Sequence, residues 1–456
     1  MTTAPAPRAR PVPLPRIWGL RPSDVVALLV GNGVFIALMW LRHGGIEQYS
    51  TLGGGLSATG QLLALYGTYL ALIQLVLMSR SPWLDEAFGM DRLAWWHRWL
   101  GFATVWLIAG HVALTILGYA TADAAAIPDE LVTLLTTYQF VLWGLVGFVL
   151  FVVIAIASVR AARRKLPYEF WFWLHIGTYL AIAFAFLHQL LAGSDFMHDP
   201  IAAAYWVGLY AIAFGLILVF RVGQPLAVSR KHDLRVAAIV PEAPGVASIY
   251  LTGYDLDQLP VRSGQYFVFR LMTRGMWWQG HPFSLSSAPN GNWLRITIKV
   301  LGRGSAAILE LPPETRVFVE GPYGVLTGIR RTRRQVTLIA GGIGIAPMRA
   351  LLESLAAVPG DLTLLYRASD ADELVFRGEL DLLAQHRGAV VHYLVGRRAD
   401  LGYDPLAAER IRALAPDIAE HDVYVCGPDG MMDAATAALR TLGLPSDRLH
   451  AERFSY

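Results

Sequence analysis

Six long apolar stretches in the first half of the chain constrain its fold more than any other feature. They are Val25–Leu41, Leu62–Met78, Trp99–Leu117, Phe140–Ser158, Phe170–Leu191 and Ile201–Phe220. Each is near the ~20 residues that a helix needs to cross the hydrocarbon core of a bilayer. We therefore expect a bundle of six transmembrane helices, with the lipid bilayer as its surroundings.

The average composition combines two unlike halves. Of the 456 residues, 55% are hydrophobic and 16% are charged, whereas soluble proteins carry roughly 25% charge. From about residue 232 onward, short Val/Ile/Leu runs alternate with turn signals and polar helices, as in soluble domains. We predict a disordered cytoplasmic tail over 1–23, a transmembrane domain over 24–222, and soluble domains over 230–328 and 333–456.

Charge and cysteine content exclude several classes of protein. The net charge of +3 is too small to predict nucleic-acid binding. Cys426 is the single cysteine, which excludes an intrachain disulfide framework and a cysteine-ligated iron–sulfur cluster. The first 23 residues are rich in Pro and Arg and lack the apolar core of a signal peptide.

The basic residues predict the orientation in the membrane. They gather in the tail and in the connections that follow the second and fourth helices, at Arg8, Arg10, Arg16, Arg21, Arg80, Arg92, Arg98, Arg160, Arg163, Arg164 and Lys165. The opposite connections are acidic, with Asp123, Asp129, Glu130, Asp195 and Asp199, and Arg42 is the exception. Because basic connections stay in the cytoplasm, we expect both termini on the cytoplasmic side of a bacterial-type inner or plasma membrane.

Four histidines lie within the apolar stretches: His97 and His111 on the third helix, and His175 and His188 on the fifth. These helices run parallel, so His97 and His175 share the cytoplasmic level, while His111 and His188 share an outer level about 20 Å away. Facing imidazoles at one level are what bis-axial haem ligation requires. The alternative is that all four are interhelical packing residues in a haem-free, membrane-anchored flavin reductase.

The spacing of these histidines differs between the two helices. His97 and His111 are 14 residues apart and lie on nearly the same helix face, whereas His175 and His188 are 13 apart and do not. We expect either an irregularity in the fifth helix near Gly177 or two ligands presented from different sides.

The spacings His97-x13-His111 and His175-x12-His188, in a six-helix domain followed by flavin and nucleotide domains, resemble the NADPH oxidase and ferric reductase superfamily. The resemblance implies two stacked b-type haems. His97 with His175 would hold the inner haem, and His111 with His188 the outer haem.

Residues 232–328 contain five short strand patterns, which predict a small antiparallel β-barrel. Within them, the segment 281–287 (HPFSLSS) resembles the flavin signature of the ferredoxin-reductase superfamily, in the form that NADPH oxidases use. The resemblance implies that Pro282 and Phe283 pack against FAD, that Ser284 hydrogen-bonds near its reactive nitrogen, and that His281 lies near the pyrophosphate. The alternative is an ordinary strand that ends in a Ser-rich turn.

A second segment of this domain is a glycine turn that follows a strand. Glycines permit close backbone approach to a phosphate, and free amides at a helix start favour an anion. Family members place the flavin pyrophosphate here, which gives Gly302, Gly304 and Ser305 as candidates. Lys299 is a further candidate, or a solvated strand residue.

From residue 335 a strand, a glycine loop and a helix predict a Rossmann-like α/β nucleotide domain. The loop has Gly341, Gly342 and Gly344, and Pro347 stands where the G-x-G-x-x-G fingerprint has its last glycine. The resemblance implies that the late Gly427-Pro428 turn faces the nicotinamide, with Cys426 close to the hydride path. The alternative for Cys426 is a small buried residue at a strand end.

Two further features concern the donor and the flavin. Arg367 and the Arg397-Arg398 pair follow strands and suit a 2′-phosphate, so we favour NADPH over NADH and expect both to be used.

The chain ends in Glu452-Arg453-Phe454-Ser455-Tyr456. Relatives place a near-terminal aromatic residue over the flavin. Phe454, which forms their Glu-x-Phe pattern with Glu452, is a better match than Tyr456.

The implied activity is electron transfer from cytosolic NAD(P)H through FAD and two haems to an acceptor outside the membrane. We favour dioxygen, giving superoxide, over a ferric chelate. Thr115 departs from the family, because animal NADPH oxidases have a further histidine four residues after the outer ligand. A membrane electron donor to a quinone or a partner protein is a further alternative, although no docking surface for a protein partner is evident.

Overall fold

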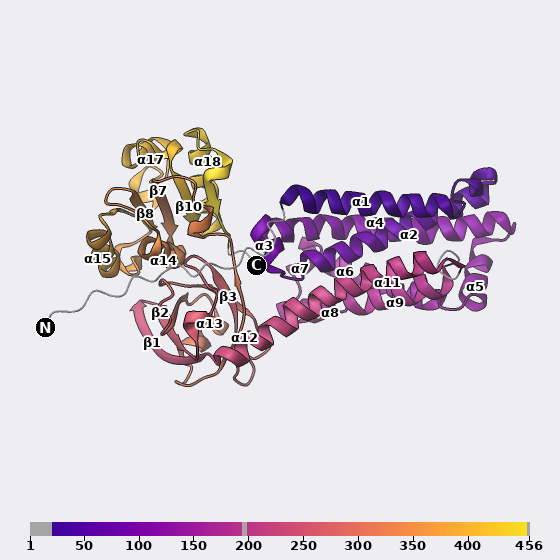
Figure 1. The fold of residues 1–456 in the computed structure, drawn as a ribbon, viewed down its shortest axis with the longest axis horizontal. Helices are drawn as coiled ribbons and strands as arrows, with labels where there is room; N and C mark the ends of the chain where they lie inside the picture. Colours follow the sequence, from indigo (N-terminus) through magenta and orange to yellow (C-terminus); the bar gives the residue numbers. More distant parts are fainter. Residues whose placement is uncertain (1–20, 194–197, 454–456) are drawn as a thin grey trace. The chain divides into compact units, whose positions relative to one another are not determined.

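The computed structural model describes residues 21–193 and 198–453, and it divides into two compact units between Phe220 and Arg221 (Figure 1). The first unit is helical, and the second contains all of the described strands. The predicted tail up to residue 20, Asp195, Phe454 and Tyr456 lie outside the described residues.

The helical unit contains the six predicted spans. They are α1 (Pro22–Arg42), α2 (Leu52–Leu77), α4 (Met90–Ala122), α6 (Val141–Ser158), the pair α8 (Tyr168–Ile176) and α9 (Thr178–Ala192), and α11 (Pro200–Ile217). Six helices of the described chain are long and apolar enough to cross a membrane, which confirms the expected number. Shorter helices α3 (Pro82–Phe88), α5 (Ile127–Thr137) and α7 (Arg160–Arg163) lie in the connections.

Helix α2 begins well before the apolar stretch that predicted it. Its first turns are rich in Gly, Ser and Thr, and Thr51 caps them by accepting a hydrogen bond from the Gly54 amide at 3.1 Å. These small residues let α2 lie close to α4: a Cβ atom on Gly60 would stand 2.9 Å from Thr115 Oγ1. Small residues at helix interfaces allow such close approach in membranes, so helix contact rather than hydropathy sets this boundary.

The fifth span is irregular at Gly177, one of the two arrangements that the histidine spacing predicted. Helix α8 ends at Ile176 and α9 begins at Thr178. The Thr178 hydroxyl donates to the His175 carbonyl at this junction. The irregularity lies between His175 and His188, and both of these rings face partners on α4.

The sixth span continues beyond the first unit. Helix α11 passes through a π-helical segment, Leu218–Gly223, into α12 (Gln224–His232). Helix α12 packs on strand β6 (Val317–Tyr323), where the Ser229 hydroxyl accepts a hydrogen bond from the Val319 amide at 2.9 Å.

Two antiparallel three-stranded sheets follow. The first has the order β1-β2-β5, formed by Arg235–Ala243, Val246–Thr252 and Leu294–Lys299; the second has the order β4-β3-β6, with β4 at His281–Ser284 and β3 at Tyr266–Leu271. Isolated bridges Arg235–Arg316 and Leu285–Ile296 link the sheets at two edges. All five predicted strand patterns form strands, while β4 was predicted only as a flavin segment.

The last part of the chain forms a parallel five-stranded sheet with the order β11-β10-β7-β8-β9. Its strands are β7 (Val336–Gly341), β8 (Leu362–Ala368), β9 (Val390–Val395), β10 (Asp422–Cys426) and β11 (Leu449–Ala451). Helices α14 (Ile345–Ser354), α15 (Arg377–Arg387), α17 (Ala408–Leu414) and α18 (Asp429–Thr441) alternate with them. The strand order reverses between β7 and β10, and ligands of such sheets bind at the carboxyl ends beside this point.

Candidate redox sites

The four membrane histidines form the two predicted pairs. The ring centres of His97 and His175 are 5.9 Å apart, and those of His111 and His188 are 6.4 Å apart. An imidazole nitrogen binds a metal at about 2 Å, so two rings on opposite sides of one metal have centres roughly 6 Å apart. Both pairs have a separation that suits a shared iron.

Hydrogen bonds orient the outer ring on α4. His111 Nδ1 lies 3.1 Å from the Gly60 carbonyl oxygen and 3.2 Å from Thr115 Oγ1. An Nδ1–H donated to a carbonyl leaves Nε2 with its lone pair, as a metal ligand requires. Thr115, at the family's extra histidine position, therefore contacts the His111 ring itself.

The His97–His175 pair has aromatic and polar neighbours on α6, α7 and α8. The Trp171 ring stacks on His175 at 5.0 Å between centres, and the Arg163 guanidinium lies 4.6 Å from the Trp171 ring centre. Ser158 Oγ lies 3.4 Å from His175 Nδ1. His97 Nδ1 is buried with no hydrogen-bond partner among the described residues. A polar group of a bound ligand would give this nitrogen a hydrogen-bond partner.

A cavity of about 340 Å³ opens between α2, α4, α6 and α9, and both outer histidines line it. Apart from these rings, its polar lining consists of hydroxyl and amide side chains: Gln48, Ser57, Gln61, Thr68, Thr115, Tyr119, Tyr138 and Gln189. The described lining residues include no Asp, Glu, Lys or Arg. A roomy, mostly apolar cavity with two facing imidazoles fits a haem.

Asp199 pairs with two basic residues at the end of α1. His43 Nε2 lies 2.9 Å and Arg42 Nη2 3.2 Å from Asp199 Oδ2. Asp199 also caps α11 by accepting from the Ile201 amide at 2.8 Å. This cluster joins the end of α1 to the start of α11.

The predicted flavin residues lie together in the second unit. Ser284 Oγ and His281 Nε2 are buried without a hydrogen-bond partner among the described residues. The glycine turn lies beside them, because a Cβ atom on Gly304 would stand 3.9 Å from His281 Cε1. Buried polar atoms are normally paired, and bound FAD would supply these two with partners, so the residues fit the cofactor.

Arg270 is a neighbour of this segment that sequence reasoning missed. It lies on β3 close to Gly280 and forms an ion pair with the buried Glu320. Burial, together with the Arg270 charge, lowers the pKa of His281 and keeps its imidazole neutral. The available signal was a single cation within the otherwise apolar strand 266–271.

The other flavin candidates have defined contacts. Ser305 Oγ accepts hydrogen bonds from the Leu301 amide at 2.9 Å and the Gly302 amide at 3.1 Å, so it shapes the turn. Lys299 Nζ lies 3.7 Å from Glu373. The Phe283 ring is parallel to His281, with centres 6.1 Å apart, while Pro282 pairs with Val268 on β3.

The glycine loop after β7 lies directly against the turn after β10. A Cβ atom on Gly344 would stand 2.3 Å from the Cys426 carbonyl oxygen, so only glycine fits there. Gly341 and Gly427 both lie against Met431, next to Pro428, and Gly342 has a positive φ of 52°. Pro347 occupies the first turn of α14, where a missing amide hydrogen is tolerated.

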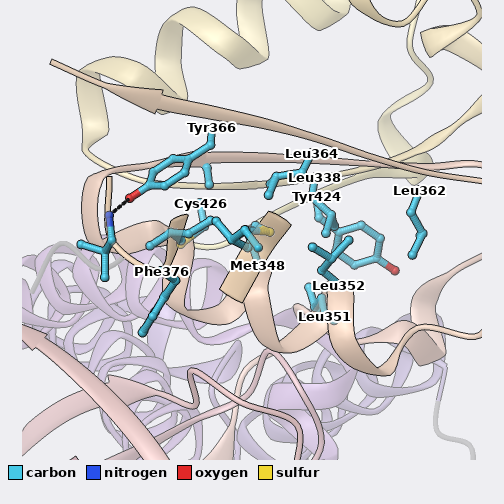
Figure 2. Packing of buried hydrophobic residues seen from close by; sticks show 14 of the residues in the cluster. Leu338, Met348, Leu351, Leu352, Leu362, Leu364, Tyr366, Phe376, Tyr424 and Cys426 are labelled. Carbon is cyan, nitrogen blue, oxygen red and sulfur yellow. Dashed lines mark hydrogen bonds between the residues drawn. The ribbon is translucent and has the colours of Figure 1, made fainter. Parts of the chain in front are cut away.

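Cys426 is fully buried at the end of β10, in a cluster with Met348, Tyr366 and Tyr424 (Figure 2). Burial, and then the charge of Glu452, raises the pKa of its thiol well above 9.0. The Glu452 carboxylate lies against Gly324, where a Cβ atom would be 2.9 Å from both of its oxygens. Glu452 therefore lies between the Cys426 end of β10 and Gly324, which follows strand β6.

The arginines proposed to bind the nucleotide phosphate differ in the hydrogen bonds and ion pairs that they make within the protein. Arg367 donates to the Leu394 carbonyl at 3.0 Å and to the carbonyls of Ala368 and Gly396, linking the ends of β8 and β9. Arg398 pairs with Asp404 at 2.7 Å. Arg397 is exposed at the start of helix α16 (Arg398–Leu401).

The apolar helices, the antiparallel sheets and the nucleotide-type sheet define a membrane-spanning, NAD(P)H-dependent flavin oxidoreductase. Three family models match in chain order: a ferric reductase like transmembrane component over 63–186, an FAD-binding domain over 248–327, and an oxidoreductase NAD-binding domain over 338–437. The chain has the ferric reductase and NADPH oxidase-type architecture, with a ferredoxin-reductase-like FAD/NAD unit. This confirms the resemblance drawn from the histidine spacing and the flavin segment.

Individual relatives match the soluble half. The ferredoxin reductase component of a 3-ketosteroid-9-alpha-monooxygenase from Mycolicibacterium smegmatis is 32% identical over 244 residues, which cover 51% of this chain and 67% of that protein. A flavohemoprotein from Chromobacterium violaceum is 33% identical over 246 residues, with 49% and 60% covered. The chain thus spans about three fifths to two thirds of these relatives. The flavohem-like FAD/NAD-binding domain of a Vibrio cholerae nitric oxide dioxygenase is 25% identical, with a TM-score of 0.42, over 49% of this chain and 99% of that domain.

Proposed function

We propose that the protein passes electrons from cytosolic NADPH, with NADH as a second donor, through FAD and two b-type haems to dioxygen outside the membrane, giving superoxide. The observation that carries the proposal is the pairing of four histidines in two facing sets on α4 and on α8 and α9. Residues 24–222 would hold the haems, 230–328 the FAD and 333–456 the nucleotide.

In the soluble unit the chain's own groups bind and orient. FAD held by these residues would supply the link between the two-electron hydride of NAD(P)H and the one-electron steps that haem iron requires. Ser284 Oγ is a buried hydroxyl free to hydrogen-bond the flavin, and the neutral His281 lies beside the glycine turn that would hold the pyrophosphate. The buried Cys426 stays a thiol, which keeps an extra negative charge away from the hydride path.

In the membrane unit the chain orients the ligands. The Gly60 carbonyl and the Thr115 hydroxyl direct His111, while Trp171 and Ser158 contact His175. These contacts fix ring orientation and ligand basicity, which are the protein's means of tuning an iron centre.

The residues around the proposed outer haem favour a neutral acceptor. The described residues that line its cavity are uncharged, so a multiply charged ferric chelate that approached a haem held there would lose hydration without a compensating partner. Dioxygen has no charge, so it loses no such hydration. Ferric-chelate reduction is the second candidate, because the matching transmembrane family is the ferric reductase component.

The direction of transfer rests on the basic connections on one side of the bundle. With the termini in the cytoplasm, the soluble unit meets cytosolic NAD(P)H and the outer histidine pair lies toward the opposite face.

Purified protein in lipid nanodiscs tests the proposal. With NADPH and air, we expect reduction of external cytochrome c that superoxide dismutase suppresses. An anaerobic arm with a ferric chelate and a ferrous indicator measures the second candidate. NADPH oxidation without superoxide, together with rapid chelate reduction, would overturn the choice of acceptor.

A further inference from the structure

Four charged side chains connect the flavin segment to the helix that follows the nucleotide loop. Arg295 comes from β5, Arg349 and Glu353 from α14, and Glu379 from α15. The arginine side chains are only 3% and 10% exposed. Buried guanidinium groups are costly unless they are paired and hydrogen-bonded, so the partners of these two arginines matter for the stability of this arrangement.

Glu379 pairs with both arginines, and Glu353 pairs with Arg349. Arg295 Nη1 and Nη2 lie 2.8 and 3.0 Å from the two oxygens of Glu379, and Arg349 Nε lies 2.7 Å from Glu379 Oε2. Arg349 Nη1 also lies 2.5 Å from Glu353 Oε2. Burial disfavours the Glu379 charge, but its bonds to the two arginines lower the pKa of this carboxyl.

The same groups hold the backbone just after Ser284. The Ser286 carbonyl accepts from Arg295 Nη2 at 2.9 Å and from Arg349 Nη1 at 3.2 Å, and the Ala288 amide donates to Glu353 Oε2 at 2.7 Å. These three hydrogen bonds to Ser286 and Ala288 thus come from side chains on β5 and α14. Helix α14 itself begins directly after the Gly341–Gly344 loop.

We propose that Arg349 is a positioning residue for hydride transfer: from the helix that follows the nucleotide loop, it fixes the flavin segment through the Ser286 carbonyl. A displacement of about 1 Å between reacting groups costs up to ~10²-fold in rate. The inference concerns only the step from NAD(P)H to FAD, so it does not depend on the haems or on the acceptor.

A simple structural cross-link between the two domains is the competing explanation, and the chain offers a matched control for it. Lys299 and Glu373 form a second ion pair between the same domains at 3.7 Å, with side chains 37% and 45% exposed. Glu373 makes no contact with segment 284–288 among the hydrogen bonds and ion pairs of the described residues, so Glu373→Gln weakens the cross-link without touching that segment.

The experiment compares Arg349→Lys, Glu379→Gln and Glu373→Gln in the full-length protein. Anaerobic stopped-flow measures FAD reduction over a range of NADPH concentrations, which separates the limiting rate from nucleotide affinity. FAD content and melting temperature are measured on each sample. Titration of dithionite-reduced protein with NADP⁺ reports nicotinamide–flavin stacking as a long-wavelength charge-transfer band.

We expect the limiting rate to fall at least tenfold in Arg349→Lys and Glu379→Gln, with a weaker charge-transfer band and unchanged FAD content. Glu373→Gln should stay within twofold of the parent. Limiting rates and bands equal to the parent, or losses that merely follow FAD content and melting temperature in all three variants, would overturn the proposal. If Arg349→Lys does not fold, Glu379→Gln decides by the same criteria, because it removes the carboxylate charge that holds the Arg349 guanidinium in place beside the Ser286 carbonyl.

Discussion

Single atoms around each imidazole determine whether it can serve a metal. His111 Nδ1 has two neighbouring oxygens, the Gly60 carbonyl and the Thr115 hydroxyl. Only the carbonyl is an obligatory acceptor, since the hydroxyl can donate or accept. The carbonyl therefore sets the tautomer, and Thr115 is an auxiliary contact.

Replacing His111 with leucine should remove the outer haem, so that the haem-to-FAD ratio falls about twofold from two to one. Thr115→Val should retain both haems, because the Gly60 carbonyl still accepts the Nδ1 hydrogen. Haem extraction assays on purified protein give this ratio. A His111→Leu variant that keeps the parental ratio would refute the ligand assignment.

The single cysteine gives a prediction about pH. Its folded pKa lies above the ordinary 9.0, so the folded state holds its proton more tightly than the unfolded state. The resulting stability is present below about pH 9 and is lost as the pH rises further. Thermal melting should fall more steeply above pH 9 in the parent than in Cys426→Ala, and thiol labelling should be at least about tenfold slower in folded than in urea-unfolded protein. Rapid labelling of folded protein would contradict the burial of Cys426.

At the scale of elements, the fifth span was predictable only in part. The 13-residue spacing of its histidines indicated either an irregular helix or ligands on different sides, and the structure places the irregularity at Gly177. The early start of α2 was not predictable from hydropathy, because Gly, Ser and Thr score low. Its cause is a tertiary contact with α4, which a single sequence does not display.

That contact can be tested with two glycines of neighbouring helices. A Cβ atom on Gly60 would stand 2.9 Å from Thr115 Oγ1, whereas one on Gly31 in α1 would meet nothing within 4 Å. Gly60→Ala should lower the melting temperature in detergent and the outer haem content. Gly31→Ala should lower neither, since its Cβ meets no neighbour and alanine is the better helix former. Equal effects of the two substitutions would argue against close α2–α4 packing.

At the scale of the whole molecule, composition and local pattern predicted the order of the parts. The length of the apolar stretches identified the membrane spans, and short runs of Val, Ile and Leu identified most of the strands. The missed features combine residues distant in sequence: Arg270 beside His281, and the Arg295–Glu379–Arg349 network. No local periodicity encodes such pairs, so only the fold displays them.

The proposed orientation of the molecule rests on the basic connections and can be measured in cells. In a Cys426→Ser background, a new cysteine replacing Asp123 should react with a membrane-impermeant maleimide from outside. One replacing Arg164 should react only after lysis, because basic connections stay in the cytoplasm. The reverse pattern would invert the proposed direction of electron flow.

The central claim is that electrons from the nucleotide reach two histidine-ligated haems. It is tested most directly by the absorption spectrum of purified, anaerobic protein before and after NADPH. The account predicts flavin bleaching together with the reduced bands of b-type haem, at two haems per FAD, and reoxidation of both on admission of air. Flavin bleaching alone, with no haem bands even after dithionite, would contradict it.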